Sequence, residues 1–381
     1  MRATVEHLAS FDRPSASDGE RRAAEWIRSE LEGFGVAARV EEEPAVGSFY
    51  LPLGLLSAIG VLAGLARGRL RLPGALLGAL ASAAIIDDVS GGPHTFRRLL
   101  PKRPTYNVTG WAGDADAGET LVFVAHHDAA HGGLIFRPEL TTVVAKRFPE
   151  WYDRQTSSPQ VMRLVAAGPA LAGLGPGFLR RLGTLISIGS TLSFVDIATR
   201  TVVPGANDNL SAVAVVLELA RRLQEEPVHG VRVLLVSTGS EESFLEGMRG
   251  WLHRHGPELP REHTRFVCLE SVGSTELIML EGEGMIRMAD YDSALRDELA
   301  EAARRVGLPL RRGLRSGLAT DALIPLKAGY PTATLAACDE LKMPANYHSQ
   351  RDVPANVDFA TVAAAAQVAE AAIRGAASAR A

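Results

Sequence analysis

The sequence has little cysteine, few aromatic residues and no strong excess of charge of either sign. Its 381 residues include only Cys268 and Cys338 as cysteines and 6% aromatic residues. Two isolated cysteines without a Cys-x-x-Cys spacing argue against a disulfide framework and favour a reducing compartment. A net charge of -4 without a basic stripe argues against a nucleic-acid partner. Residues 1–20 lack the apolar core of a secretory signal, so we expect a cytoplasmic chain, with membrane attachment left open.

The composition is that of a folded protein with a large core. Hydrophobic residues make up 46% of the chain and charged residues 22%. The length allows two or three domains, but one large α/β domain with insertions fits equally well. We adopt the latter, a single domain over residues 1–381.

Outside residues 51–100 and 135–200, short apolar runs alternate with amphipathic segments. Helical spacing of apolar residues after a Ser17–Glu20 capping box predicts a first helix that ends at Gly33 and Gly35. Further helices are predicted at Asn209–Leu223, Tyr291–Val306 and Phe359–Ile373. Strands are predicted at Val36–Glu41, Leu121–Ala125, Val231–Ser237, Phe266–Leu269 and Pro331–Ala337. This alternation predicts a three-layer α/β sandwich, in which a central mixed, mostly parallel sheet carries helices on both faces.

Two insertions, at residues 51–100 and 135–200, read as hydrophobic helical hairpins with basic tips. Their apolar arms are Leu51–Ala66, Gly74–Ile86, Leu164–Leu179 and Leu182–Val195. The tips are the segment RGRLRLP and the pair Arg180–Arg181. Each arm is shorter than the roughly 20 residues of a spanning helix. The insertions therefore remain candidates for a lid, a membrane contact or a homodimer interface.

Residues of the types that bind metals lie after the predicted strands, and one of them, Asp208, lies just before a predicted helix. They are His126, Asp128, Asp208, Glu241, Glu242, Glu270 and His348. Each one alone has a plainer explanation, since Asp208 could cap a helix and Glu241–Glu242 could be a solvated pair. Ligands in open α/β sheets bind at the carboxyl ends of strands, so the joint placement predicts one shared crevice.

These segments resemble the zinc exopeptidases related to aminopeptidase S, aminopeptidase Y and glutamate carboxypeptidase, a group that includes the glutaminyl cyclases. The resemblance is carried by Ala125–Asp128, Gly205–Asn209, Glu241–Glu242 with Leu245 and Gly247, Glu270–Gly273, Thr320–Asp321, and Tyr347–Ser349 followed by Asp352. It covers roughly residues 1–50, 100–135 and 200–375.

The resemblance implies two Zn²⁺ ions per chain. His126 and Glu270 would hold one ion, His348 and Glu242 would hold the other, and Asp208 would bridge both. Imidazole and carboxylate ligands suit zinc and leave positions open for water.

The resemblance also assigns the neighbouring polar residues. Glu241 would be the general base, and Asp128 would orient the imidazole of His126. Asn209 would support the bend that presents Asp208, and Asp321 would lie outside the ligand set. The spare histidines, His127 and His131, are expected to be wall residues.

The implied function is hydrolysis of terminal peptide bonds by a di-zinc metallopeptidase, with an aminopeptidase as the leading case and a peptide or small amide as substrate. The alternatives are a glutaminyl cyclase-like acyl transferase, which would use one zinc, and a non-catalytic membrane-associated homologue. Two departures stand out: the family usually has Asp where this chain has Glu270, and the segment between His126 and Asp208 is unusually long.

Overall fold

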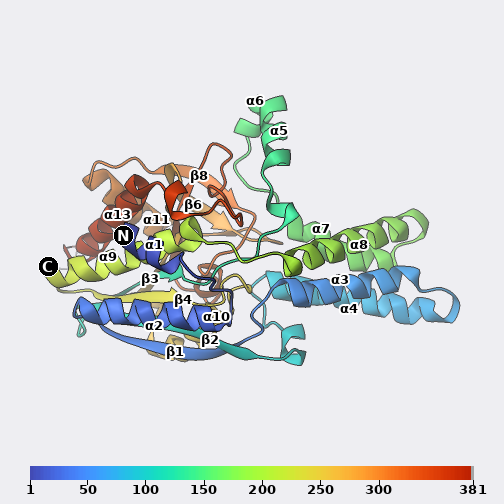
Figure 1. Ribbon diagram of the computed structural model, residues 1–381, viewed down its shortest axis with the longest axis horizontal. Coiled ribbons are helices and arrows are strands. Elements are labelled where there is room, and N and C mark those ends of the chain that lie inside the picture. The colour runs from blue at the N-terminus through green and yellow to red at the C-terminus, as the bar shows by residue number, and fades with distance from the viewer. Residues whose placement is uncertain (379–381) are drawn as a thin grey trace.

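In a computed structural model, which describes residues 1–378 apart from the side chain of Leu140, the chain is built around one mixed β-sheet (Figure 1). The strands are β1 (Ala37–Ala45), β2 (Arg103–Gly113), β3 (Thr120–His126), β4 (Arg232–Thr238), β5 (Thr264–Glu270), β6 (Glu276–Glu283), β7 (Ala289–Asp290), β8 (Arg311–Ser316) and β9 (Thr332–Cys338). Their order across the sheet is β1-β2-β4-β3-β5-β9-β6-β7, with β8 paired to β6. The central strands β4, β3, β5 and β9 run parallel, whereas β1, β2 and β6 join their neighbours antiparallel.

Helices cover both faces of this sheet. One face carries α1 (Arg2–Leu8), α2 (Asp18–Gly33), α9 (Ser211–Glu225), α11 (Ser293–Arg305) and α13 (Phe359–Ser378). The other carries α10 (Glu246–His255) and α12 (Leu323–Lys327). Along β3, Leu121 and Phe123 pack into the first layer, and Val122 and Val124 into the second. Burial on both faces explains why this strand is a continuous apolar run. The predicted three-layer fold with a mixed sheet is confirmed.

The strands and helices predicted outside the insertions are present, with ends shifted by a few residues. The capping box is only half right: the Ser17 hydroxyl accepts a hydrogen bond from the Glu20 amide, but the Glu20 carboxylate turns to the amides of Ala16 and Ser240. The prediction missed β2, β6, β7 and β8. The sequence of β2, RPTYNVTGWAG, mixes polar residues, proline and glycine.

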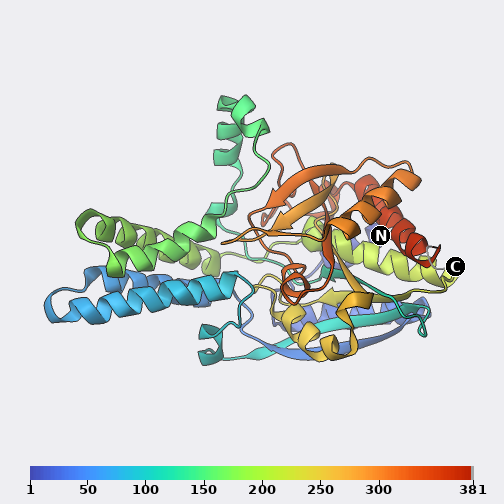
Figure 2. The ribbon, with the colours of Figure 1, turned by 180° about the vertical axis from the view of Figure 1, so that it is seen from behind.

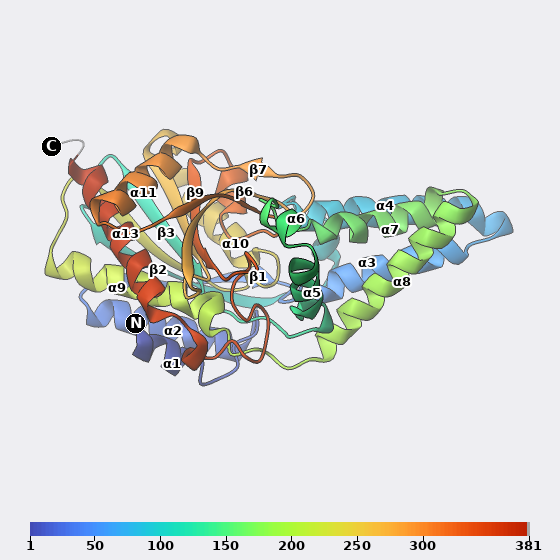
Figure 3. The same ribbon diagram turned by 90° about the horizontal axis from the view of Figure 1, so that it is seen from above.

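The two insertions form one bundle of four helices that projects from the sheet domain (Figure 1, Figure 3). These helices are α3 (Tyr50–Leu65), α4 (Arg71–Val89), α7 (Val161–Leu174) and α8 (Gly177–Thr199). The predicted tip of the second hairpin was wrong. The chain turns at Gly175–Pro176, and Arg180 and Arg181 lie inside α8, one turn from the bundle's free end. Two short helices, α5 (Glu139–Arg147) and α6 (Pro149–Asp153), project sideways near the bundle root (Figure 1, Figure 2).

A buried ion-pair network fastens the bundle root to the sheet domain. Arg97, fully buried, contacts Asp88 of α4 with Nε–Oδ1 and Nη2–Oδ2 distances of 2.6 and 2.9 Å. Its Nη1 donates to the Ser243 carbonyl at 2.8 Å and lies 3.0 Å from Oε2 of Glu246. Because Ser243 directly follows Glu242, the bundle is tied to the loop after β4.

We predict that Arg97→Ala lowers the free energy of unfolding by about 3–5 kcal/mol, because it strands the buried Asp88 carboxylate without a counter-ion. Chemical denaturation measures this loss. Arg98→Ala removes an exposed neighbouring charge and should change stability by less than about 0.5 kcal/mol. Equal, small effects of both substitutions would contradict the structural role of the pair.

Candidate metal centre

The candidate ligands come from separate segments that meet at the carboxyl ends of the parallel strands. His126 ends β3, and Glu270 ends β5. Glu242 lies in the loop after β4, and His348 lies in the loop after β9. Asp208 lies in the irregular turn Ala206–Leu210 before α9. In parallel strands these ends share one edge of the sheet, so residues far apart in sequence reach one site.

The five side chains form two groups that share Asp208. His126 Nε2 lies 3.2 Å from Asp208 Oδ1 and 3.8 Å from Glu270 Oε1. His348 Nε2 lies 3.3 Å from Asp208 Oδ2 and 3.1 Å from Glu242 Oε2. Within each group the potential ligand atoms all lie within 4.8 Å of one another. Each carboxylate oxygen of Asp208 therefore faces a different imidazole, as a bridging ligand must.

Hydrogen bonds from its backbone amides to the Asp352 carboxylate hold the turn that carries Asp208. Asp352 accepts from the amides of Asn207 and Asp208, at 2.7 and 3.0 Å. Gly205 has φ +58°, and a Cβ there would lie 2.6 Å from the Asp208 carbonyl oxygen, so glycine is required. Asp208 is not a helix cap, since its carboxylate points to the two imidazoles.

Asp128 is buried and holds both His126 and the Glu241–Glu242 loop. Its Oδ1 lies 3.3 Å from His126 Nδ1 and accepts from the Glu241 amide at 3.1 Å. Its Oδ2 accepts from the Glu242 amide at 3.2 Å and from the Ser15 hydroxyl at 2.6 Å. The carboxylate thus orients one imidazole and also fixes the backbone that presents the adjacent glutamates.

Asn209 positions the third segment. Its Nδ2 donates to the Leu269 carbonyl at 2.9 Å and approaches Glu270 Oε2 at 3.4 Å. Its Oδ1 accepts from the Ser271 amide at 2.8 Å. Asn209 therefore ties the end of β5 to the Asp208 turn, and does more than support the bend on its own segment.

The chemistry of this cluster fits divalent cations. Asp208 Oδ2 and Glu242 Oε1 are buried and accept no well-formed hydrogen bond. Burial raises the pKa of Glu270 to about 7, partly offset by the hydrogen bond with His126. Burial alone would lower the pKa of His348, but Glu242 and Asp208 raise it to about 10. The buried carboxylates lie close together and raise the pKa of the neighbouring imidazoles. Carboxylate and imidazole groups are the ligands by which proteins bind Zn²⁺.

Glu241 lies beside both groups, and it also forms a third set of possible ligands with His126 and Glu242, whose atoms lie within 4.8 Å of one another. Its Oε2 lies 3.9 Å from His126 Nε2. Burial raises the pKa of its carboxyl well above the usual range, opposed by His126 and reinforced by Glu242 and Glu270. A carboxyl of raised pKa beside a metal cluster is suited to carry protons.

The remaining polar residues of the predicted site divide. His131 lines a pocket next to Glu242, as expected of a wall residue. His127 does not: it is fully buried beneath the site, with Nδ1 2.9 Å from the Ser237 hydroxyl, because the strand's alternation turns it away from His126. Asp321 is buried, accepts from the Thr238 hydroxyl and joins neither metal group.

Two buried residues, Arg13 and Glu20, support the site, and the sequence did not predict this role for either. Arg13 donates to the carbonyls of His127, Pro204 and Gly205, and so joins the β3 loop to the Asp208 turn. Glu20 accepts from the Ser240 amide at 2.7 Å, directly before Glu241. The capping pattern gave Glu20 a local explanation, and nothing around Arg13 marks it in the sequence.

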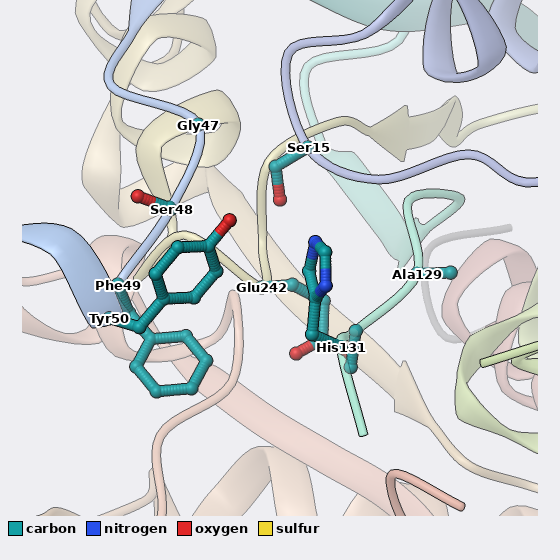
Figure 4. A pocket seen from close by; sticks show the side chains of 9 residues that line it. Ser15, Gly47, Ser48, Phe49, Tyr50, Ala129, His131 and Glu242 are labelled. Carbon is teal, nitrogen blue, oxygen red and sulfur yellow. The ribbon is translucent and has the colours of Figure 1, made fainter. Parts of the chain in front are cut away.

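The pocket beside the centre is walled by the bundle root (Figure 4). Phe49 and Tyr50 enter it from the start of α3, opposite His131 and Glu242. The Tyr50 and His131 rings meet edge to face with centroids 5.3 Å apart. The residues that lead into the first insertion therefore form one wall of the pocket beside the candidate centre.

The comparisons with known proteins agree with this geometry. Residues 192–373 match the family described as Peptidase family M28. No curated protein matches the chain in a sequence search. The resemblance to the zinc exopeptidases is confirmed by the family match together with the structural neighbours.

Solved structures share the fold across nearly the whole chain at low identity. An aminopeptidase from Aneurinibacillus sp. superposes with a TM-score of 0.56 at 15% identity, covering 99% of this chain and 93% of that one. A Tannerella forsythia glutaminyl cyclase gives 0.57 at 15% identity, covering 98% and 96%. A Zn-dependent exopeptidase from Parabacteroides distasonis gives 0.56 at 14% identity, covering 98% and 96%.

We predict that Asp128→Asn weakens zinc affinity by about 10–100-fold, because it removes the charge that orients His126 and offers an amide donor to backbone amides. Competition with a chromogenic chelator measures this change. Ser15→Ala, which removes one donor to the same carboxylate without touching the imidazole, should change affinity by no more than a few-fold. An unaltered affinity in folded Asp128→Asn protein would contradict the assignment.

Zinc binding at pH 7 should release more than one proton per chain. The raised pKa values of His126 and His348, the latter about 10, keep both imidazoles protonated in the metal-free protein, and Glu270 at about 7 is half protonated. Ligands must lose these protons to coordinate, so affinity should rise as pH increases above 7. Calorimetry in buffers of different ionisation enthalpy counts the protons, and a count of zero would contradict this protonation scheme.

Proposed function

Because residues 192–373 match peptidase family M28, we propose that the chain is a zinc-dependent aminopeptidase with two metal ions in one active centre. One ion would be held by His126, Glu270 and Asp208. The second would be held by His348, Glu242 and the other oxygen of Asp208. The observation that supports this most is the shared position of Asp208, whose oxygens lie 3.2 and 3.3 Å from the two imidazoles.

Two zinc ions bound there would supply Lewis-acid activation of a water molecule and of the scissile carbonyl. The chain's own groups carry the protons. Glu241 takes a proton from the attacking water and delivers it to the nitrogen of the departing amine. Its raised pKa suits both steps, because the carboxyl can hold the proton between them. Asp128 keeps His126 oriented while charge develops.

The residues that line the pocket would restrict which substrates reach the centre. Phe49 and Tyr50 narrow the approach to Glu242, and the ring of His131 lies opposite. A narrow site mouth suits the end of a chain better than its middle, which supports exopeptidase over endopeptidase action. The substrate is therefore proposed to be a peptide or small amide with a free amino terminus.

A glutaminyl cyclase-like transferase is the second candidate, since the Tannerella forsythia enzyme has the same fold. That reaction would need one zinc per chain. The complete pair of ligand groups favours two, so metal stoichiometry separates the candidates.

We predict that Glu241→Gln lowers kcat for an aminoacyl p-nitroanilide by about 10²–10⁴-fold while both zinc ions remain bound, because the amide cannot accept the proton. Initial rates and elemental analysis of the same sample measure the two quantities. Glu25→Gln on the exposed face of α2 is the matched control and should leave the rate unchanged.

Three results would count against the proposal. Full activity of metal-loaded Glu241→Gln protein would reject the base. Activity only on substrates with a blocked amino terminus would reject the aminopeptidase. Cyclisation of a glutaminyl peptide with one zinc per chain would favour the transferase.

A further inference from the structure

The exposed large apolar side chains are concentrated in the two insertions. Among the described residues, every large hydrophobic side chain that is exposed lies between Leu51 and Val195, except Val306. Leu72 is 79% exposed, Leu76 61% and Leu185 65%. Soluble monomers rarely expose contiguous apolar patches of this extent. The bundle is therefore built to be covered.

The bundle interior is packed with small residues in its outer part. Gly60, Gly78 and Gly183 face the interior, where a Cβ on Gly78 would lie 2.5 Å from the Pro169 carbonyl oxygen. Larger buried side chains, such as Phe194, occur at the root. Leucines outside and glycines inside reverse the arrangement of a water-soluble bundle and match helix packing in membranes. The spacing of Gly60 with Gly64, and of Gly74 with Gly78, fits the same close approach.

Charges are confined to the two ends of the bundle. No charged residue interrupts 72–86 of α4 or 182–195 of α8. These stretches of 15 and 14 residues span about 22 and 21 Å at the helical rise. The free end carries only basic residues: Arg67, Arg69, Arg71, Arg180 and Arg181. Long arginine side chains extend the reach by several ångströms toward the roughly 30 Å of a hydrocarbon core.

The helices α5 and α6, here called the α5–α6 arm, provide a second, independent sign of membrane contact near the bundle root. This arm carries the exposed rings of Phe148 and Trp151, 55% and 57% accessible, next to Lys146 and Arg147. Three acidic residues balance its three basic ones, and Arg154 pairs with Glu150. The arm projects across the bundle direction (Figure 1, Figure 2). Aromatic rings with basic neighbours are typical of the membrane–water interface.

We propose that the four-helix bundle is embedded in a lipid bilayer, with its arginine-bearing end in the far headgroup layer and the α5–α6 arm on the near surface. By length and composition, Gly68–Val89 and Gly177–Thr199 could each cross a membrane, and only 33% and 22% of their most apolar windows are buried. A core helix of a soluble protein would be mostly buried. A second copy of the chain would cover one side of the bundle, whereas exposed leucines lie on α3, α4, α7 and α8 alike.

With the bundle embedded in the bilayer, the pocket beside the candidate centre would lie close to the membrane surface. Phe49 and Tyr50 lie at the root of α3, so the mouth of the candidate active site would open at the membrane surface. The ion pairs of Arg97 would fix the catalytic domain at that height. The inference does not depend on the proposed reaction, and its test needs no activity.

Tryptophan reporters in the full-length chain test the proposal. The native tryptophans, Trp26, Trp111, Trp151 and Trp251, all lie outside the bundle. Leu80→Trp and Ile188→Trp place an indole on outward-facing sites in the middle of α4 and α8. In vesicles of phosphatidylcholine and phosphatidylglycerol brominated near the acyl-chain ends, the added fluorescence should fall by more than half. The protein should also float with the vesicles at alkaline pH.

Val306→Trp is the matched control, because Val306 is 37% exposed on the sheet domain and its reporter should not be quenched. Unquenched reporters at both bundle sites, in a chain that stays soluble as a discrete dimer without detergent, would overturn the proposal in favour of a second copy. A second set of vesicles carries bromines near the headgroups. Quenching of the bundle reporters only in this second set would overturn the proposal in favour of surface binding.

Discussion

The candidate centre depends on one carboxylate shared between two imidazoles. Asp208 can present an oxygen to each only because Asp352 holds the amides before it and Asn209 ties the turn to β5. Asp128 performs the equivalent task on the other side, where it orients His126 and the Glu241–Glu242 backbone. The ligands are thus fixed by hydrogen bonds that do not require a metal, and a site organised beforehand loses little entropy when it binds one.

The same chain combines two kinds of packing. The sheet domain has a water-soluble core, in which β-branched and leucine side chains fill both faces. The outer part of the bundle places most of its leucines outside and several glycines inside, whereas Leu53 and Leu56 are buried at its root. The buried Arg97 joins these halves through Asp88 and Glu246, close to the loop that carries Glu242. The bundle and the candidate centre are therefore mechanically connected, so the proposed membrane position would also fix the orientation of the centre.

The sequence predicted those parts that rest on regular patterns. Strands buried on both faces, such as β3, appear as apolar runs, and the ligand residues directly follow them. The strand β2 could not be found, because its residues fit the sheet only through pairing with β1 and β4. Arg13 and Glu20 were also missed, since the partners that join them to the site, His127 and Ser240, lie 114 and 220 residues away. The turn at Gly175–Pro176 was missed because the arginines nearby suggested a later tip.

Two divalent cations are proposed to lie between these side chains, with Asp208 common to both. Anomalous X-ray diffraction at the zinc edge, on crystals of the zinc-loaded chain, tests it directly. We expect two peaks about 3.5–4 Å apart, one bounded by His126 and Glu270 and the other by His348 and Glu242. A single peak, or ions held without Asp208, would contradict it.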